Sequence, residues 1–484
     1  MLASAHVLAV AALALAPAAL GVTNYADDFV APKTILQAGF DERTILAQQT
    51  LVQWSNSLNG KAAKMANGTW AVVNKNYLAP SGDPHDYMSW RPYFWPDCSQ
   101  AGNTTELTYD EIFKQCEFKN EDGHLNPNAR LINNIGDFDD LANAVWFNAL
   151  TWGVTRSPTY SKRAIQYLDT WFLNPDTKMN PNLNYAQMTG GKDGQTGSHT
   201  GILDLKPMAK IASGILLFRE GNAEGWNSTF DGQLQDWVKE YIGWITTNKI
   251  ALEEKAAPNN HGSFYYTQLA ALYLIAGDND NAIATAKEYF EGKFTSQILE
   301  NGDQPLESAR TRPYHYLAYN LAAIVTTGRI AEYAGANFWN STATSGAGIE
   351  KAAEFAMAYP PGVDKVDELF PIIGAIGSIF GDPDNKYADW LNTQSQGKYV
   401  SDASFLWNQP LSDSGNGKGS YITFAGVGGT NTLSAGATPT GGTAKKGANP
   451  SASLAAMTSA AGVKATYSWQ LLFVGTSLSA MLLL

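Results

Sequence analysis

Two short segments of the 484-residue sequence carry side chains suited to removing a proton beside a carboxylate. Asn259–Gly262 places the amide of Asn260 next to the imidazole of His261, and later in the chain the guanidinium of Arg310 precedes the phenol of Tyr316. Amide, imidazole and guanidinium donors neutralise a carboxylate, and a Tyr or His side chain transfers protons. These residues predict cleavage of a polyuronate by elimination. No metal ion or other cofactor is required, because the protein donors neutralise the charge.

The spacing of these residues indicates which elements must position them. Asn260 and His261 are adjacent, so both reach one ligand only from a loop or from the start of a helix. Arg310 and Tyr316 do not share one straight helical face. Pro313 lies between them and favours a bend or a helix start, which would bring both side chains toward a common cleft.

Each of these residues also has a simpler structural explanation. Asn259–Gly262 could be a helix N-cap beside a core histidine. Arg310 could form an ion pair with Glu307 one helical turn away, and Tyr316 could belong to the core. Their joint occurrence with an aromatic, irregular region and an amide-rich loop favours the catalytic interpretation.

The irregular region spans residues 60–135 and is rich in Pro, Gly, Asn and aromatic residues. Pro92 and Pro96 exclude a regular helix there. An irregular segment of this length inside a compact domain is usually functional, so we expect a lid or a cleft wall. A second irregular segment, rich in amides and glycine, spans residues 179–204.

Cys98 and Cys116 are the two cysteines of the chain. In an oxidising compartment their spacing suits one local disulfide within the lid; the alternative is a pair of buried thiols. A zinc site is not expected, because it needs more ligands than two cysteines supply.

After residue 137 the sequence predicts one helix after another, with Ser, Thr, Asp or Pro at many starts and Gly or Asn at many ends. Short connections between successive helices make antiparallel hairpins. We therefore predict an all-α fold, an incomplete (α/α) toroid of helix hairpins with long irregular lid loops. The predicted helices span residues 41–57, 140–154, 158–173, 205–220, 229–247, 263–277, 280–292, 312–335, 347–358 and 363–380.

Composition and net charge narrow the classes of molecule that the protein could bind. The net charge is −12, with no basic stripe, which argues against nucleic acid. The chain is 44% hydrophobic and 12% aromatic, enough for a large core and for rings that stack on sugars. An acidic polysaccharide remains a suitable partner if positive groups gather in a cleft. We expect the protein to act as a monomer.

Both ends of the chain resemble targeting signals. Residues 1–21 predict a signal peptide, and residues 22–424 the catalytic domain. Residues 425–460 form a Gly/Ser/Thr-rich linker, and residues 461–484 predict a GPI-anchor signal. The alternative, a tail-anchoring membrane helix, needs a longer apolar span of about 20 residues. We expect a secreted protein, anchored through GPI at the outer face of the plasma membrane or cell wall. Four sequons fit this export: Asn67, Asn103, Asn227 and Asn340.

An ordered set of motifs across residues 80–340 resembles the alginate lyase superfamily, in particular its branch that cleaves alginate or glucuronan. The combination of motifs is specific, although each is short. The motifs are His85-Asp86-Tyr87, Pro92–Asp97, Trp171–Leu173, Met179–Leu183, Tyr185–Gln187, Gly201–Asp204, Asn259–Gly262 and Arg310-Thr311.

The resemblance implies an α/α toroid and metal-independent β-elimination. It assigns carboxylate neutralisation to Asn260 and Arg310, and neutralisation or proton abstraction to His261. Tyr316 would be the acid and also the base, with Tyr314 as a competing phenol.

The resemblance also implies contacts with the sugar chain. Glu254 would orient the site, with a solvated charge at a helix end as its alternative. His199 stands where we would expect an arginine. The remaining implied contacts lie on the lid and along the cleft: His85, Tyr87, Arg91, Trp95, Asn180, Tyr185 and Gln187.

The polymer itself stays open at this stage. In β-linked mannuronate or glucuronate the proton at C5 and the bond to O4 lie on one side of the ring, so one Tyr serves both proton transfers. In guluronate they lie on opposite faces, and His261 would act as a second group.

Two other functions compete with the lyase. A glycoside hydrolase needs two carboxylates, for which Asp137, Asp139, Asp140 and Glu254 are the candidates. A non-catalytic surface protein could bind acidic polysaccharide through the aromatic lid.

Overall fold

The computed structural model describes residues 28–36, 42–102, 106–191 and 194–399. The predicted signal peptide, the sequon at Asn103, the linker and the anchor signal lie outside the described residues. The other three sequon asparagines, Asn67, Asn227 and Asn340, are exposed. No helix in the described ranges has both the length and the apolar character needed to cross a membrane.

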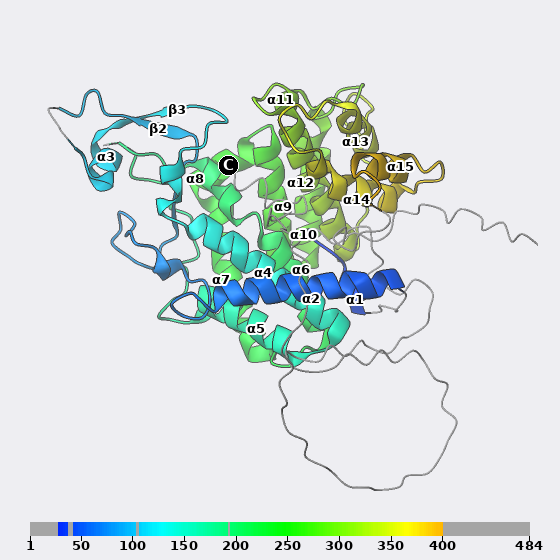
Figure 1. Ribbon diagram of the computed structural model, residues 1–484, viewed down its shortest axis with the longest axis horizontal. Coiled ribbons are helices and arrows are strands. Elements are labelled where there is room, and N and C mark those ends of the chain that lie inside the picture. Colours follow the sequence, from blue (N-terminus) through cyan, green and yellow to red (C-terminus); the bar gives the residue numbers. More distant parts are fainter. Residues whose placement is uncertain (1–27, 37–41, 103–105, 192–193, 400–484) are drawn as a thin grey trace, which may run out of the picture.

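The described body is an α/α toroid, as predicted (Figure 1). Its inner helices pack in chain order, α4 on α6, α6 on α9 and α9 on α12, while α2, α5, α7 and α10 cover them from outside. The helices are α1 (Pro32–Leu36), α2 (Glu42–Ala62), α3 (Tyr109–Gln115), α4 (Asn134–Thr155), α5 (Pro158–Leu168), α6 (Met208–Gly221), α7 (Ser228–Thr247), α8 (Lys249–Ala256), α9 (Asn260–Ile275), α10 (Asn279–Glu291), α11 (Pro305–Ser308), α12 (Pro313–Ala334), α13 (Ile349–Ala358), α14 (Phe370–Phe380) and α15 (Lys386–Gln394).

Inner and outer helices differ in how their side chains are buried. The inner helix α9 is buried on nearly every face, because neighbours surround it. The outer helix α7 buries one stripe, Leu234, Trp237, Val238, Tyr241 and Ile245, at the spacing of a single helical face. The outer layer therefore shields the inner helices from solvent, and the inner helices are left to carry the site.

Local sequence signals account for several helix ends. Asn227 caps α7 by accepting hydrogen bonds from the backbone N–H groups of Thr229 and Phe230, at 3.1 and 3.0 Å. Gly335 ends α12 in the left-handed region at φ 112°. The helix predicted over residues 363–380 is wrong in its first part, where a 3₁₀ turn, Val366–Leu369, precedes α14. Pro371 suits the first turn of an α-helix and disfavours its interior.

The two irregular segments contain short strands that the sequence did not predict, three in residues 60–135 and one in residues 179–204. β1 (Met88–Trp90) pairs in parallel with β4 (Tyr185–Met188), and β2 (Phe94–Asp97) pairs antiparallel with β3 (Glu117–Asn120). We call residues 94–120, which comprise β2, α3 and β3, the lid ribbon. It projects from the helical body at the upper left of Figure 1.

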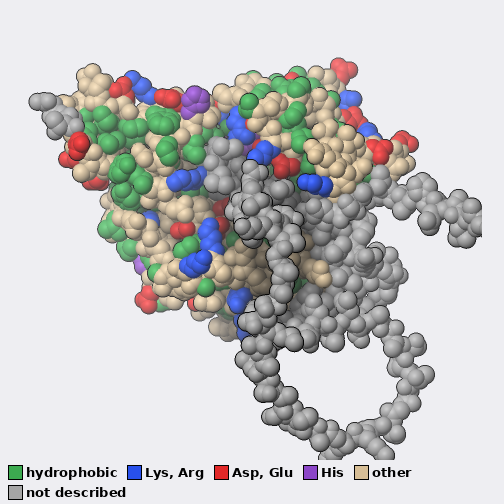
Figure 2. All heavy atoms as spheres, viewed as in Figure 1, with side chains coloured by type: hydrophobic (Ala, Val, Ile, Leu, Met, Phe, Trp, Pro, Cys, Tyr) green, Lys and Arg blue, Asp and Glu red, His purple; other side chains and the backbone are tan. Residues whose placement is uncertain are grey.

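The predicted disulfide joins Cys98 to Cys116 within the lid ribbon. Asp97 of β2 lies opposite Glu117 of β3, so the disulfide bridges the next cross-strand position and extends the ladder. Hydrophobic side chains gather over this ribbon in the space-filling view (Figure 2). The cross-link therefore holds together a small element that has little core of its own.

Candidate active site

Both sequence segments meet in one cleft between the lid and the inner helices. Asn260 and His261 reach it from the start of α9, Arg310 from the loop before α12, and Tyr316 from the first turns of α12. The lid and the region from β4 to the 3₁₀ segment η4 (His199–Leu205) form the facing walls. The full lining is Arg91, Pro92, Tyr93, Phe94, Asn120, Asp122, Gln187, Thr200, Leu203, Asn260, His261, Arg310, Tyr316 and Tyr319.

Asn260 is held by a buried carboxylate from a distant part of the chain. Glu307 accepts hydrogen bonds from the Asn260 backbone N–H at 2.7 Å and from its side-chain amide at 2.5 Å. Burial raises the pKa of Glu307, and the two hydrogen bonds oppose that rise. The Asn260 Oδ1 atom is buried without a protein partner among the described residues. The amide is thus fixed in orientation with hydrogen-bonding capacity left for a ligand.

Steric crowding explains why Gly262 ends the Asn259–Gly262 segment. A Cβ atom at Gly262 would overlap the carbonyl oxygen of Ala257 at the end of α8. The first turn of α9 therefore approaches the backbone of α8 more closely than any other residue would allow. This approach places His261 beside Glu254 of α8.

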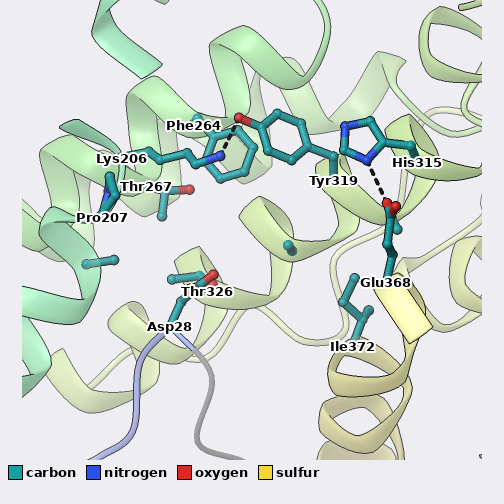
Figure 3. A pocket seen from close by; sticks show the side chains of 13 residues that line it. Asp28, Lys206, Pro207, Phe264, Thr267, His315, Tyr319, Thr326, Glu368 and Ile372 are labelled. Atoms are coloured by element: carbon teal, nitrogen blue, oxygen red, sulfur yellow. Dashed lines mark hydrogen bonds and ion pairs between the residues drawn. The ribbon is translucent and has the colours of Figure 1, made fainter. Parts of the chain in front are cut away.

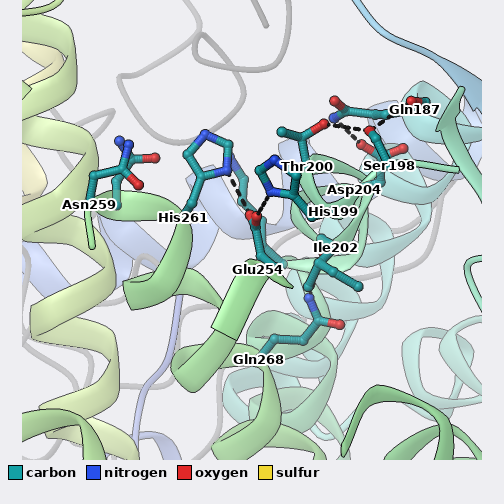
Figure 4. Close-up of polar contacts among 12 residues, drawn as sticks. Gln187, Ser198, His199, Thr200, Ile202, Asp204, Glu254, Asn259, His261 and Gln268 are labelled. Carbon is teal, nitrogen blue, oxygen red and sulfur yellow. Dashed lines mark hydrogen bonds and ion pairs between the residues drawn. The ribbon is translucent and has the colours of Figure 1, made fainter. Parts of the chain in front are cut away.

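Glu254 bridges two histidines (Figure 4). Its Oε1 atom lies 2.7 Å from Nδ1 of His261, and its Oε2 atom lies 2.6 Å from Nδ1 of His199 in the 3₁₀ segment η4 (His199–Leu205). Burial opposes ionisation of Glu254, but the two imidazoles outweigh it, so the pKa of this carboxyl lies below its ordinary value. Glu254 is fully buried, so the alternative of a solvated helix-end charge is wrong.

With Nδ1 occupied, each imidazole has only Nε2 left for another partner. Figure 4 shows these nitrogens on the side of each ring that faces away from Glu254. The ring centroids of His199 and His261 are 6.0 Å apart. His199 therefore lies beside His261, and the carboxylate of Glu254 joins the two imidazoles.

The same trio is the group of described residues whose ligand atoms come close enough for a metal ion, within 4.8 Å of one another. In this structure each carboxylate oxygen of Glu254 is hydrogen-bonded to one imidazole, Oε1 to Nδ1 of His261 and Oε2 to Nδ1 of His199. Together the three residues offer two imidazole nitrogens and one carboxylate oxygen, the number of protein ligands in a typical catalytic zinc site.

Arg310 and Tyr316 are brought together by the helix start at Pro313, as their spacing predicted. Nη2 of Arg310 donates a hydrogen bond to the Tyr316 hydroxyl at 2.9 Å, and the guanidinium lies 3.9 Å from the centre of the Tyr316 ring. The same Nη2 lies 3.1 Å from Oδ1 of Asp122, just beyond the lid ribbon. Burial raises the pKa of Tyr316, and the positive charge of Arg310 is the first effect that opposes it.

Tyr314, the competing phenol, lies outside the cleft. Its ring is 2% exposed, and its hydroxyl donates to the backbone carbonyl of Val366 at 2.9 Å. Two residues along an α-helix correspond to roughly 200° of rotation, so Tyr314 and Tyr316 project from opposite sides of α12. The helix geometry decides the choice that the sequence left open.

A third buried carboxylate, Asp204, shapes the wall opposite α12. Its oxygens accept hydrogen bonds from the hydroxyl of Tyr87 at 3.1 Å, from Ser89, and from the amide of Gln187 at 2.7 Å. Burial raises the pKa of Asp204 to about 6. Gln187 lines the cleft as predicted and has a left-handed backbone, φ 45°, held by its contacts with Ser89 and Ser198. Tyr87 is 1% exposed and supports the wall from behind.

Arg91 and Gln187 line the cleft, but the other predicted sugar contacts are not among its lining residues: His85, Tyr87, Trp95, Asn180, Tyr185, His199, Glu254 and Tyr314. His85 donates through Nδ1 to the carbonyl of Lys178 at 2.6 Å, and the Trp95 indole donates to the carbonyl of His124 at 2.9 Å. The amide of Asn180 donates to Asp83 and Asp86, at 2.9 and 2.8 Å. These bonds tie the irregular segments together. His85, Trp95 and Asn180 thus each use a polar side-chain group within the protein.

The pocket behind the cleft supports α12 (Figure 3). Lys206 donates to the Tyr319 hydroxyl at 2.7 Å, and His315 bonds through Nδ1 to Glu368 at 2.6 Å. Burial lowers the pKa of Lys206 to about 8. Tyr319 lines both this pocket and the cleft, so the buried polar groups brace the wall that carries Tyr316.

The carboxylates suggested for a hydrolase are not paired across the cleft. Asp137, Asp139 and Asp140 lie on α4 and do not line it, and Glu254 is committed to two histidines. Among the cleft-lining residues in the described ranges, Asp122 alone carries a carboxylate, and it is paired with Arg310. The two facing carboxylates required for glycoside hydrolysis are therefore not found at this cleft.

Sequence reasoning missed Tyr93, Asp122 and Tyr319 as cleft residues, and Glu307 as the partner of Asn260. Tyr93 lies inside a motif that had been singled out, so its position in the lid was an available signal. Asp122 and Glu307 carried no such signal, because their partners are 188 and 47 residues away in the chain.

A toroid of helix hairpins whose cleft presents a phenol, a guanidinium, an amide and an imidazole defines a polysaccharide lyase. The chain belongs to the alginate lyase family, whose family model, described as alginate lyase, matches residues 71–367.

Comparison with solved structures agrees with this assignment. The chain is similar to the crystal structure of an alginate lyase from Bacteroides ovatus, with 28% identity, a TM-score of 0.65, and coverage of 77% of this chain and 96% of that one. It also matches an alginate lyase from Sphingomonas species A1, with 16% identity, a TM-score of 0.40, and coverage of 69% and 79%. A search of curated proteins gave no match.

Proposed function

We propose that this lyase cleaves a 1,4-linked polyuronate, glucuronan or alginate, by metal-independent β-elimination in the cleft between the lid and α12. The observation that carries the proposal is the contact of Arg310 with the Tyr316 hydroxyl at 2.9 Å, in the same cleft as Asn260 and His261. A proton acceptor thus lies beside donors that can hold a carboxylate.

The reaction proceeds through a carboxylate-stabilised anion. A base removes the proton from C5, and the electron pair of the C5–H bond moves toward the carboxylate at C6. The C4–O4 bond then breaks, a double bond forms between C4 and C5, and O4 leaves with a proton. The protein must therefore neutralise the carboxylate, accept one proton and donate one.

Tyr316 performs both proton transfers in this proposal. As a phenolate it accepts the C5 proton, and as a phenol it donates that proton to O4. Arg310 stabilises the anionic form of Tyr316 through its charge and its hydrogen bond. Burial raises the pKa of Tyr316, which makes its anion a stronger base toward a weakly acidic C–H bond.

Asn260 and His261 neutralise the substrate carboxylate. One hydrogen of the Asn260 amide nitrogen is donated to Glu307, and the second is left to be donated to the substrate carboxylate. His261 bonds through Nδ1 to Glu254, so its imidazolium form donates from Nε2 while Glu254 balances the charge. These donors compensate the negative charge that develops on the substrate, a task that a metal ion performs in other enzymes.

A single phenol that performs both proton transfers suits substrates in which the C5 proton and O4 lie on one side of the sugar ring. Glucuronan and mannuronate blocks have this geometry, so one phenol suffices. Guluronate blocks would need His261 as a second proton carrier. Because His261 is bonded to Glu254, we propose the single-phenol route, with guluronate as the poorer substrate.

Arg91 extends the positive lining of the cleft beyond the reacting sugar. Its guanidinium lies 4.6 Å from the centre of the Phe94 ring, and burial lowers its pKa from the ordinary value. A partly desolvated guanidinium gains from an anionic partner. We assign Arg91 to the carboxylate of a neighbouring uronate in the chain.

Product analysis tests the proposed function. The purified protein is incubated with glucuronan, polymannuronate and polyguluronate, before and after dialysis against EDTA. We expect an ultraviolet-absorbing unsaturated end from glucuronan or polymannuronate, at a rate that EDTA does not change. Reducing ends without that absorbance would indicate a hydrolase, and binding without new ends a non-catalytic protein. Loss of activity in EDTA, with recovery on adding a divalent ion, would contradict the metal-independent mechanism.

We further propose that the protein is secreted and held at the cell surface by a GPI anchor, on the basis of its two terminal segments. Phospholipase C specific for phosphatidylinositol is expected to release the full-length protein from membranes. A chain ending before Gly447 is expected to appear in the medium without treatment. Membrane attachment of that shortened chain would show that the anchor signal is assigned wrongly.

A further inference from the structure

Three side chains beside the cleft form a set of metal-ligand type, and the mechanism above uses only two of them. His199 comes from η4, Glu254 from α8 and His261 from the start of α9, and each offers one ligand atom within 4.8 Å of the others. Figure 4 shows both imidazoles turned toward the carboxylate of Glu254. His199 has no role in the proposed elimination, so the trio calls for a further explanation.

We propose that His199, Glu254 and His261 bind a divalent transition-metal ion such as Zn²⁺, and that the bound ion inhibits the elimination. Two imidazole nitrogens and one carboxylate oxygen are the protein ligands of one type of zinc site, in which water takes the fourth position. Imidazole nitrogen suits Zn²⁺, Ni²⁺ and Cu²⁺, whereas Ca²⁺ and Mg²⁺ prefer oxygen ligands. The inhibitory effect rests on the proposed function, in which the reaction needs no ion; the binding does not.

The packing of three elements brings the ligands together before any ion binds. α8 packs against η4 and against α9. The close approach at Gly262 sets the distance between α8 and the first turn of α9. The residue before η4, Ser198, donates from its hydroxyl to the carbonyl of Gln187 at 2.8 Å. The ligands are therefore held by the fold, as a defined metal site requires.

An ion can bind with small movements of the two rings. Nδ1 of His261 and Nδ1 of His199 lie 2.7 and 2.6 Å from the Glu254 oxygens. Bonds of about 2.0–2.1 Å to a tetrahedral ion place its ligand atoms about 3.3 Å apart, so each imidazole must move outward by about 0.6 Å. The ion takes the place of the hydrogens between Nδ1 and Glu254, and each neutral imidazole then carries its hydrogen on Nε2.

The exposure of the three ligands also suits an ion. The Glu254 side chain is fully buried, whereas the side chains of His199 and His261 are 37% and 18% exposed. A carboxylate shielded from water attracts a cation more strongly than an exposed one. The partly exposed imidazoles leave a path for the ion and for its water ligand.

An ion at this site disturbs the groups that hold the substrate carboxylate. It takes Glu254 from His261 and moves the His261 ring. Asn260 stays in place, because Glu307 holds both its backbone and its side-chain N–H groups. The open position of the ion also attracts a carboxylate of the polymer. A misplacement of about 1 Å costs about 10²-fold in rate, so we expect saturating Zn²⁺ to lower kcat/KM by about 10- to 100-fold.

Calorimetry measures the binding directly. The protein, without an affinity tag and dialysed free of EDTA, is titrated with ZnCl₂, and we expect one ion per chain with a micromolar or lower Kd. His199→Gln keeps a hydrogen-bond donor beside Glu254 but supplies no imidazole ligand. Loss of an outer-shell partner alone weakens metal affinity by about 10- to 100-fold, so loss of this direct ligand is expected to weaken it by more than about 100-fold.

His124→Gln is the matched control. The His124 side chain is 74% exposed, and its Nδ1 lies 3.6 Å from Glu121. This pair offers the same two ligand types, but no third ligand joins it among the described residues. The Zn²⁺ affinity and stoichiometry of this variant are expected to equal those of the wild type. Thermal unfolding of each variant checks that the fold is retained.

Elimination rates on short uronate oligomers, with and without Zn²⁺, test the inhibition, and each variant is compared with itself. We expect inhibition that EDTA reverses in the wild type and in His124→Gln, and none at the same Zn²⁺ concentration in His199→Gln. The His199→Gln measurement also shows any effect of Zn²⁺ on the substrate itself.

Absence of saturable Zn²⁺ binding would overturn the inference, and so would equal binding by the wild type and folded His199→Gln. A bound ion that leaves the rate unchanged, or raises it, would overturn the inhibitory role. If His199→Gln does not fold, the visible absorption of Co²⁺ bound to the wild type distinguishes imidazole ligands from surface carboxylates. Failure of the proposed function would look different, because EDTA-treated protein would form no unsaturated product while calorimetry still detected the ion.

Discussion

The Tyr316→Phe variant is expected to lose elimination activity almost completely while it still binds the polymer. The substitution removes one oxygen atom from a side chain that both accepts and donates the transferred proton. General acid or base catalysis contributes about 10²- to 10⁴-fold for a single transfer, so losing both transfers is expected to reduce kcat by at least about 10⁴-fold. Ultraviolet absorbance of the product measures the rate, and calorimetry or a retention assay measures binding.

Tyr314→Phe provides the matched control on the same helix. Its hydroxyl bonds to the carbonyl of Val366, away from the cleft, so kcat is expected to stay within a few-fold of the wild type while stability falls by about 1 kcal/mol. Near-normal activity in Tyr316→Phe would refute the assignment of the base. A large loss in Tyr314→Phe, with Tyr316→Phe unaffected, would exchange the two roles.

The Arg310→Ala variant is expected to show the second largest loss, because this guanidinium contacts the Tyr316 hydroxyl and we also propose that it helps to neutralise the substrate carboxylate. Removal of one preorganised donor costs about 10²- to 10³-fold in kcat, and here two functions are lost together. The positive charge of Arg310 lowers the pKa of Tyr316. Its removal should therefore also move the acidic limb of the pH profile to higher pH.

Arg310→Lys separates charge from geometry. Lysine keeps the positive charge but lacks the planar fork that reaches Tyr316 and Asp122 together. We expect an activity between those of the wild type and Arg310→Ala, with a smaller movement of the acidic limb. Equal activity of wild type and Arg310→Ala would exclude Arg310 from the mechanism and leave neutralisation to Asn260 and His261.

Much of the helical fold could be predicted because its signals are local. Capping residues such as Asn227, the apolar stripe of α7 and the proline at the start of α12 all act within a few residues. Short helices such as α8 escaped prediction because one or two turns leave little periodicity to detect. The strands of the lid were missed for a related reason, since each contains three or four residues and is defined by a partner elsewhere.

The choice between Tyr314 and Tyr316 as the phenol of the cleft shows what a sequence motif cannot determine. Both residues are phenols in the same short stretch, and only the helix phase and the packing of α12 determine which one enters the cleft. The same holds for Tyr87, which lies in a recognised motif but donates to the buried Asp204. A motif indicates which residues are grouped, and the direction of each side chain follows from its neighbours.

By itself, the sequence predicted the chemical groups of the candidate site, the helical class of the fold and a local disulfide. Those features depend on residue type and on interactions over short stretches of chain. Only the tertiary structure decided that Glu307 orients Asn260, that Glu254 joins His199 to His261, and that Tyr93 and Asp122 of the lid meet Tyr316 and Arg310. These contacts join residues far apart in the chain, and their formation depends on how the packed helices and the lid close around one cleft.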